Sequence, residues 1–268
     1  MSSGLIKACG MTRVEDALAA VEAGFDAVGL VFAESPRRVN PRTAREICSL
    51  LPSSVLRVGV FLGQTQAEIR GLMEYCGLDL AQLHEAGGTG LAEAFGGRAL
   101  VAIRPRLPKD LDGLDGYRGA FALLIDAWHP EKAGGTGITC DWTLAARAAR
   151  ASRVILAGGL SPDNVAEAIN RVRPFGVDVS SGVEAAPGIK DPALLRRFAR
   201  AAKAAFESLR GDAGISFKEQ AETEGASCVG ATPMNGYTVA HGKRAEAAGG
   251  NHPLAGADGD TKEMVSER

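Results

Sequence analysis

The feature that most constrains this chain is a regular alternation of short apolar runs with helical patterns between residues 5 and 209. Eight strand-sized runs occur, at 5–10, 26–32, 55–62, 79–84, 99–104, 120–127, 153–159 and 176–181. Amphipathic segments separate most of them, which is typical of parallel strands joined by helices. Eight such strands in about 210 residues predict a compact (β/α)8 barrel in the α/β class. A doubly wound sheet is the alternative, but it does not normally need eight strands at this short, even spacing.

Several intervening segments carry helix start signals. Thr65 is followed three residues later by Glu68, which is the capping-box pattern. Ser161 precedes Pro162, which predicts a helix cap followed by proline in the first turn. Residues 191–209 form the clearest amphipathic pattern, with one continuous apolar stripe. These signals support helices between the predicted strands.

The texture of the chain changes near residue 213. Gly, Ala, Ser, Thr and Glu dominate from there on, and Phe217 and Tyr237 are the only aromatic residues. Such a segment buries too little apolar surface to offset the entropy of ordering it. The sequence therefore predicts a barrel domain at 1–212 and a low-complexity, disordered tail at 213–268. A tail that binds a partner or directs targeting is the alternative, although no motif in it names a partner.

Charge and cysteine content exclude several classes of protein. The net charge is −2 and the pI about 6.1, which argues against a general binder of nucleic acid or anionic membranes. The five cysteines are odd in number and lack C-x-x-C spacing, so we expect neither a disulfide framework nor a zinc site. The chain has no long apolar stretch of the kind found in signal peptides or membrane spans. We expect a cytoplasmic protein.

Polar residues gather where the predicted strands end, which is where barrels of this type place their functional groups. His84 ends the fourth apolar run, Cys9 and Asp126 stand one residue before the ends of the first and sixth, and Arg37 follows Pro36 in the loop after the second. Each has a purely structural alternative. The thiol could be a small core residue, the histidine a satisfied structural one, the aspartate a cap and the arginine a solvated charge.

Glycine- and serine-rich segments follow the last three predicted strands. They read GGTG at 134–137, AGGL at 157–160 and SSGVE at 180–184. The residues of interest are Gly135, Gly137, Gly158, Gly159, Ser180 and Ser181. Glycine lets backbone N–H groups approach a ligand, and a short helical turn would add its positive end. The combination predicts a phosphate site, against the alternative of ordinary tight turns.

Ordered motifs along residues 5–209 resemble phosphoribosylanthranilate isomerases of tryptophan biosynthesis. They are KACGMTRVEDA, GLVFAESPRRV, RVGVF, LAQLH, LLIDAWHPEKAGGTGITCDW, LAGGLSPDNV and VDVSSGVEAAPGIKD. The resemblance implies a TIM barrel and a cofactor-free, metal-free Amadori rearrangement. In it, N-(5-phosphoribosyl)anthranilate becomes 1-(2-carboxyphenylamino)-1-deoxyribulose 5-phosphate. The tail is not covered.

The resemblance also implies residue roles. Cys9 matches the general base, Asp126 the general acid, and Arg37 the residue that meets the anthranilate carboxylate. Asp178 matches an aspartate near the sugar hydroxyls, and His84 falls in the substrate-binding motif LAQLH. The glycine- and serine-rich loops match the phosphate site. For such chemistry we expect burial to raise the pKa of Asp126, and cations at Lys7 and Arg37 to lower that of Cys9.

Three positions depart from the family pattern. Ala8 stands where isoleucine is usual, on the face expected to point toward the helices. Arg38 replaces a frequent aromatic residue, and is either a second charge for a carboxylate or a solvated side chain. Glu85 replaces a usual glycine after His84, which bears on the local loop.

Two other functions compete with this reading. A related barrel isomerase acting on the histidine-pathway aminoaldose would need a second phosphate site, for which SPRR at 35–38 is a weak candidate. A non-catalytic phosphosugar binder or scaffold would not need Cys9 and Asp126 at opposing strand ends. The sequence fits a monomer or a homodimer.

Overall fold

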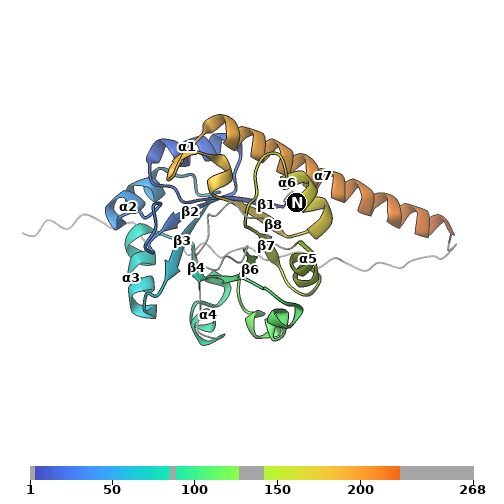
Figure 1. The fold of residues 1–268 in the computed structure, drawn as a ribbon, viewed down its shortest axis with the longest axis horizontal. Helices are drawn as coiled ribbons and strands as arrows, with labels where there is room; N and C mark the ends of the chain where they lie inside the picture. The colour runs from blue at the N-terminus through green and yellow to red at the C-terminus, as the bar shows by residue number, and fades with distance from the viewer. Residues whose placement is uncertain (1–3, 85–88, 127–141, 224–268) are drawn as a thin grey trace, which may run out of the picture. The chain divides into compact units, whose positions relative to one another are not determined.

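The computed structural model of the protein describes residues 4–84, 89–126 and 142–223, and its strands close into one parallel barrel (Figure 1). The eight barrel strands, paired in the order of the chain, are β1 (Leu5–Cys9), β2 (Ala27–Val31), β3 (Leu56–Leu62), β4 (Leu80–His84), β5 (Ala99–Ile103), β6 (Ala122–Ile125), β7 (Val154–Leu156) and β8 (Gly176–Val179). β8 pairs with β1 and closes the ring. The predicted (β/α)8 TIM barrel is confirmed.

Helices surround the barrel (Figure 1). They are α1 (Val14–Ala23), α2 (Pro41–Leu50), α3 (Gln66–Cys76), α4 (Thr89–Phe95), α5 (Trp142–Ala151), α6 (Val165–Val172) and α7 (Pro192–Thr223). The predicted capping box is present, since the Thr65 side chain accepts from the Glu68 N–H and Glu68 accepts from the Thr65 N–H. A two-stranded hairpin of β9 (Glu184–Ala186) and β10 (Ile189–Lys190) follows β8.

Side chains alternate between the two faces of each strand, which separates an inner layer from an outer one. On β1, Ile6 and Ala8 are fully buried in the cluster between barrel and helices. Lys7 and Cys9 therefore face the interior. The lower interior is filled by small and aliphatic side chains that include Leu5, Ala27 and Leu124. The polar groups consequently lie nearer the carboxyl ends of the strands than these apolar side chains do.

One predicted helix start differs in the structure. α6 begins at Val165 rather than at Pro162, because residues 162–164 form a turn. The Ser161 carbonyl accepts from the N–H groups of Asn164 and Val165, so Ser161 starts that turn. Residues 106–117 contain two 3₁₀ turns, Pro108–Leu111 and Leu114–Tyr117, as their content of proline and glycine would favour.

α7 carries the apolar stripe predicted for 191–209. Leu195, Phe198, Ala202 and Phe206 are buried, and the helix packs against α1 and α6. Its backbone continues past residue 213 to Thr223. Residues 224–268 lie outside the described part of the chain. Among the described residues, no helix combines the length and the apolar character needed to cross a membrane.

Candidate active site

A charged pair lies inside the barrel beside the Cys9 thiol. Lys7 Nζ donates to Asp178 Oδ1 at 2.8 Å, across the β1–β8 closure where the two residues face each other in register. Gly29 on β2 leaves room for both interior side chains of β1. A Cβ added there would lie 2.8 Å from Cys9 Sγ and 3.2 Å from Lys7 Nζ. The thiol, the ammonium and the carboxylate thus share one compact interior space.

Burial decides the protonation of the thiol. It raises the pKa of Cys9 above its ordinary value, and the cations Lys7 and Lys190 offset this only in part. The expected lowering of the Cys9 pKa is therefore wrong in direction, because the thiol is desolvated at the end of β1 and Asp178 adds a negative charge nearby. Burial also disfavours the Lys7 cation, but Asp178 and Cys9 outweigh it and raise the pKa of Lys7.

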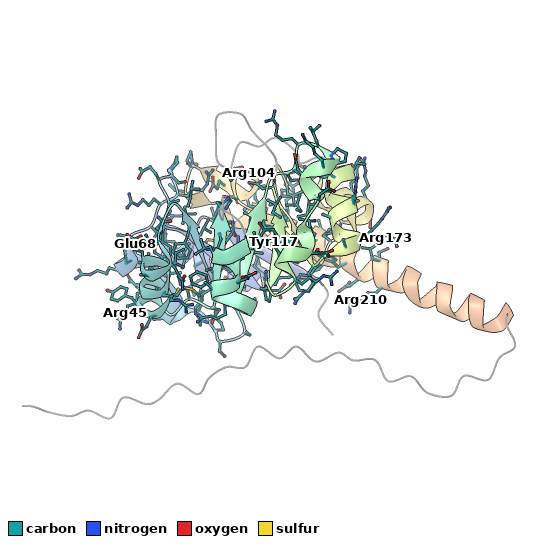
Figure 2. The ribbon with its side chains drawn as sticks, turned by 90° about the horizontal axis from the view of Figure 1, so that it is seen from below. Arg45, Glu68, Arg104, Tyr117, Arg173 and Arg210 are labelled. Carbon is teal, nitrogen blue, oxygen red and sulfur yellow. The ribbon has the colours of Figure 1, made fainter. Side chains whose placement is uncertain are left out.

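Asp126 follows β6 and lies buried among groups of both signs. Its N–H donates to the Ile103 carbonyl, and its Oδ2 lies 3.4 Å from Arg104 Nε. The side chain of Arg104 also reaches His84, with Nη2 at 2.8 Å from Nδ1. Figure 2 labels Arg104 in the upper middle part of the ribbon. The ends of β4, β5 and β6 are thereby joined through Arg104.

The contacts of His84 fix its tautomer. A guanidinium only donates, so Nδ1 accepts from Arg104 and Nε2 carries the proton. The structure places Gln82 Nε2 at 2.8 Å from His84 Nε2, and two N–H donors cannot bond each other, so we assign the amide the reverse orientation, with Oε1 accepting that proton. The reversal also gives a partner to Gln82 Oε1, which is otherwise buried with none among the described residues. Burial, with Arg104 and Lys7, lowers the pKa of His84 to about 3, so the ring is neutral.

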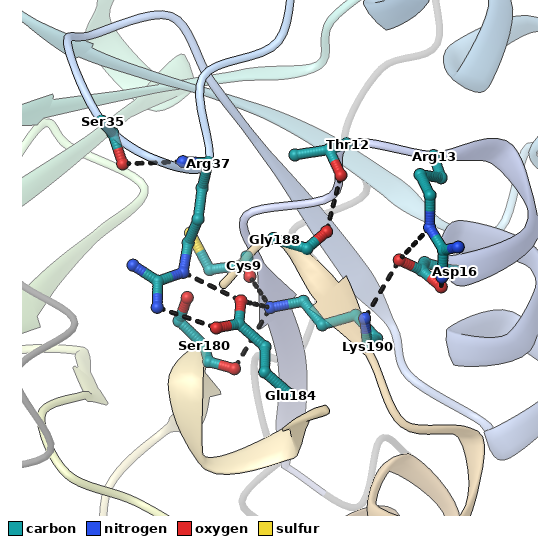
Figure 3. Close-up of polar contacts among 10 residues, drawn as sticks. All are labelled: Cys9, Thr12, Arg13, Asp16, Ser35, Arg37, Ser180, Glu184, Gly188 and Lys190. Carbon is teal, nitrogen blue, oxygen red and sulfur yellow. Dashed lines mark hydrogen bonds and ion pairs between the residues drawn. The ribbon is translucent and has the colours of Figure 1, made fainter. Parts of the chain in front are cut away.

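A second polar cluster surrounds the loop after β2 and the β9–β10 hairpin (Figure 3). Arg37 donates from Nε and Nη2 to the two carboxylate oxygens of Glu184, each at 2.8 Å. Lys190 Nζ donates to the same carboxylate and to the carbonyls of Cys9 and Ser180. The cluster therefore links Arg37 to the backbone at the ends of β1 and β8.

Gly10 makes this arrangement possible. Its φ of +80° turns the chain away from the end of β1. A Cβ at this position would lie 2.7 Å from Arg37 Cδ. Only glycine combines this backbone conformation with such a close approach. The turn thus brings Arg37 next to Cys9.

The loops after β7 and β8 lie against each other. Gly158 and Gly159 both have positive φ, and Ser180 and Ser181 lead into a 3₁₀ turn over Ser181–Val183. A Cβ on Gly182 would collide with the Leu160 carbonyl oxygen, so the two loops meet without intervening side chains. The predicted phosphate residues of these loops are thus brought together. Gly135 and Gly137 lie outside the described residues.

The three departures have different outcomes. Ala8 is fully buried against the helices, as expected. Arg38 pairs with Glu34 at 2.9 Å on an exposed surface, which fits the solvated alternative. Glu85 lies outside the described residues.

Sequence reasoning singled out neither Gln82 and Arg104 nor Glu184 and Lys190. Gln82 and Arg104 are polar residues in or directly after apolar runs, and this position could have marked them as candidates for the polar interior of the barrel. Glu184 and Lys190 stand in VDVSSGVEAAPGIKD, the segment that resembles the family after the eighth strand.

A closed (β/α)8 barrel with a buried thiol and a buried carboxylate at the ends of two strands is typical of an enzyme that moves protons. Residues 6–201 match the family model for N-(5'-phosphoribosyl)anthranilate (PRA) isomerase. The chain therefore belongs to the N-(5'-phosphoribosyl)anthranilate isomerase family, and it is an isomerase.

Similar proteins cover the same part of the chain. It is 47% identical over 199 residues to an N-(5'-phosphoribosyl)anthranilate isomerase of Pelobacter propionicus, covering 74% of this chain and 95% of that protein. The Geobacter metallireducens enzyme of the same name is 48% identical over 200 residues, covering 74% and 98%.

Solved structures agree. The phosphoribosyl anthranilate isomerase of Thermotoga maritima superposes with a TM-score of 0.69 at 41% identity, covering 75% of this chain and 99% of that one. A structure of such an isomerase in complex with reduced 1-(o-carboxyphenylamino)-1-deoxyribulose 5-phosphate has a TM-score of 0.66 at 39% identity, with the same coverage.

Proposed function

We propose that this chain converts N-(5-phosphoribosyl)anthranilate to 1-(2-carboxyphenylamino)-1-deoxyribulose 5-phosphate in tryptophan biosynthesis, by general acid and base catalysis without a cofactor. The observation that carries the proposal is the placement of Cys9 and Asp126. Both are buried at the ends of strands, β1 and β6, in a barrel that matches the isomerase family over residues 6–201.

Asp126 is assigned the acid step. Opening the furanose requires a proton on the ring oxygen as the C1′–O bond breaks and a C1′=N bond forms. A carboxylic acid can supply that proton only while it is protonated. Arg104, at 3.4 Å from Asp126 Oδ2, and the nearby carboxylate of Asp178 bring charges of opposite sign to this group.

Cys9 is assigned the base step. It removes the proton from C2′. The electron pair of that C–H bond forms a C1′=C2′ double bond, and the pair of the C1′=N double bond moves onto the nitrogen. The resulting enol then becomes the ketone as its hydroxyl proton is lost and a proton adds to C1′. The isomerisation needs no net proton. Because thiolate is the active form and burial raises the Cys9 pKa, Lys7 and Lys190 support catalysis by stabilising this minority form.

The remaining residues are assigned to binding. Arg37 would hold the anthranilate carboxylate, His84 would contact the substrate, and Asp178 would lie near the sugar hydroxyls. Backbone N–H groups and hydroxyls of the glycine- and serine-rich loops would hold the phosphate, at Gly135, Gly137, Gly158, Gly159, Ser180 and Ser181.

The same proposal covers location and assembly. We infer that the reaction takes place in the cytoplasm. One solved relative, from Thermotoga maritima, is described as a dimeric enzyme from which monomers were generated. The proposed acid, base and carboxylate-binding residues here come from one chain, so both a monomer and a homodimer are expected to be active.

The test is turnover of phosphoribosylanthranilate by the full chain and by three variants. Cys9→Ala and Asp126→Asn should each lower kcat by about 10²- to 10⁴-fold, which is the usual contribution of a general acid or base. A chain ending at residue 223 should retain full activity. Near-normal turnover by either point variant would contradict its assignment. Absence of turnover by the wild type would overturn the proposal.

A further inference from the structure

The hydrogen bonds within the Arg37–Glu184–Lys190 cluster occupy one edge of the Arg37 guanidinium (Figure 3). A second edge of the same group is not used by them. Glu184 engages Nε and Nη2, each at 2.8 Å, which is the side-on edge of Arg37. Among the described residues, no hydrogen bond engages Nη1. The end-on edge formed by Nη1 and Nη2 therefore retains donors for a second carboxylate.

Lys190 has no such spare capacity. Its ammonium group is fully buried and donates to three oxygens, those of Cys9, Ser180 and Glu184. Its backbone N–H donates to Asp16 Oδ2 at 3.0 Å, which anchors the hairpin to α1. Lys190 therefore holds Glu184 in place and is not itself a ligand for substrate.

The charges of the cluster leave one positive charge unmatched. Two cations share the single carboxylate of Glu184, whereas Arg37 and Glu184 alone would be neutral. Burial opposes the Glu184 charge, but hydrogen bonds from Arg37 and Lys190 outweigh it and lower the pKa of Glu184. Burial lowers the pKa of Lys190, against the effect of Glu184. Because two cationic side chains share this one carboxylate, the cluster attracts a further anion although Arg37 already has a partner.

We propose that Glu184 is a positioning residue, which holds the side-on edge of Arg37 so that its end-on edge is presented to the carboxylate of the substrate. The inference rests on the proposed function, in which that carboxylate belongs to the anthranilate ring. Presenting a fixed guanidinium spares the cost of ordering a long side chain when the substrate binds. Lys190 keeps the site cationic.

The experiment compares two inhibitors that differ only in one carboxylate. One is the reduced product, a 2-carboxyphenylamino deoxy-sugar phosphate, and the other is its phenylamino counterpart without the carboxylate. Inhibition constants are measured at neutral pH for wild type, Glu184→Gln and Glu184→Asp. Glu167→Gln is the matched control, because Glu167 makes only an exposed pair with Arg171. Thermal unfolding verifies that each variant is folded.

Wild type should prefer the carboxylate-bearing inhibitor by about tenfold or more, as a charge-assisted pair implies. Glu184→Gln should lose most of that preference while its affinity for the phenylamino inhibitor stays within about twofold. Glu184→Asp, whose carboxylate is set back by one methylene from Nε and Nη2 of Arg37, should also lose preference and serves as the test if Glu184→Gln fails to fold. Glu167→Gln should behave as wild type.

The two ways of failing are distinguishable. A wild type that turns over phosphoribosylanthranilate while a folded Glu184 variant keeps the full carboxylate preference overturns this inference and leaves the proposed function intact. A wild type that turns over the substrate without any carboxylate preference also overturns it. A wild type without turnover overturns the proposed function and this inference with it.

Discussion

Lys7 and Asp178 form a buried ion pair across the strands that close the barrel. Their 2.8 Å contact joins side chains that are 1% and 9% exposed, so water screens neither charge. Replacing one member leaves the other charge buried and unpaired, which is far more costly than losing an exposed pair.

We expect Lys7→Met to lower the free energy of unfolding by about 3–5 kcal/mol, because Asp178 would remain close to Asp126 without its counter-ion. Denaturant unfolding at neutral pH measures this loss. The double variant Lys7→Met, Asp178→Asn should recover more than half of it. Arg171→Met, which breaks an exposed pair, should cost less than about 1 kcal/mol. Similar losses for both single variants would contradict the argument.

The thiol of Cys9 should titrate above its ordinary value of 9.0, since burial raises its pKa. The thiolate absorbs in the ultraviolet, and subtracting the titration of Cys9→Ser removes the signal of the other cysteines. The Cys9 pKa should rise further in Lys7→Met, because that variant loses a cation beside the thiol. A difference titration centred well below 9 would show that the nearby cations outweigh burial.

Gly29→Ala should both destabilise the protein and reduce turnover. The added methyl would lie 2.8 Å from Cys9 Sγ, and relieving such overpacking costs about 1–3 kcal/mol. Gly71→Ala is the control, because Gly71 lies inside α3 with nothing within 4 Å of an added Cβ. It should stabilise the protein by about 0.5–1 kcal/mol. The contrast is read by thermal unfolding and by kcat, and equal effects of the two substitutions would count against the packing argument.

Acid should weaken the fold through His84. Its folded-state pKa of about 3 lies below the ordinary 6.5, so the unfolded chain takes up a proton that the folded chain refuses. The stability associated with His84 is complete above pH 6.5 and falls as the pH drops toward 3, by at most about 1.4 kcal/mol per pH unit. Unfolding free energies of wild type and His84→Asn, compared across this range, isolate the effect. Parallel curves for the two proteins would refute it.

Much of this architecture could be predicted from the sequence. The eight strands lie inside the eight apolar runs because their period and spacing are local properties. The inward orientation of Lys7 and Cys9 and the outward orientation of Ala8 follow from strand alternation. Asp126 could be recognised as buried because a purely apolar run leads directly to it.

The parts that could not be predicted depend on contacts between distant segments. Whether burial or neighbouring cations control the Cys9 pKa is decided by the depth of the thiol and by Asp178 and Lys190, none of which a local pattern reveals. Arg37 meets Glu184 only because a two-stranded hairpin of two and three residues folds back after β8, and elements that short have no detectable periodicity. Ser161 illustrates the same limit, since a turn and a first helical turn share their favoured residues.

The pairing of β1 with β8 has a consequence for how the protein is made. Lys7 and Asp178 are 171 residues apart in the chain, so the ribosome must deliver nearly the whole barrel before either finds its partner. Until then the nascent chain carries two unpaired sheet edges. The β1 edge holds Lys7, whose ion-pair partner Asp178 lies on β8. Such late, long-range closure is characteristic of slow-folding chains, and it makes an N-terminal translation product that stops before β8 a candidate for aggregation rather than for partial activity.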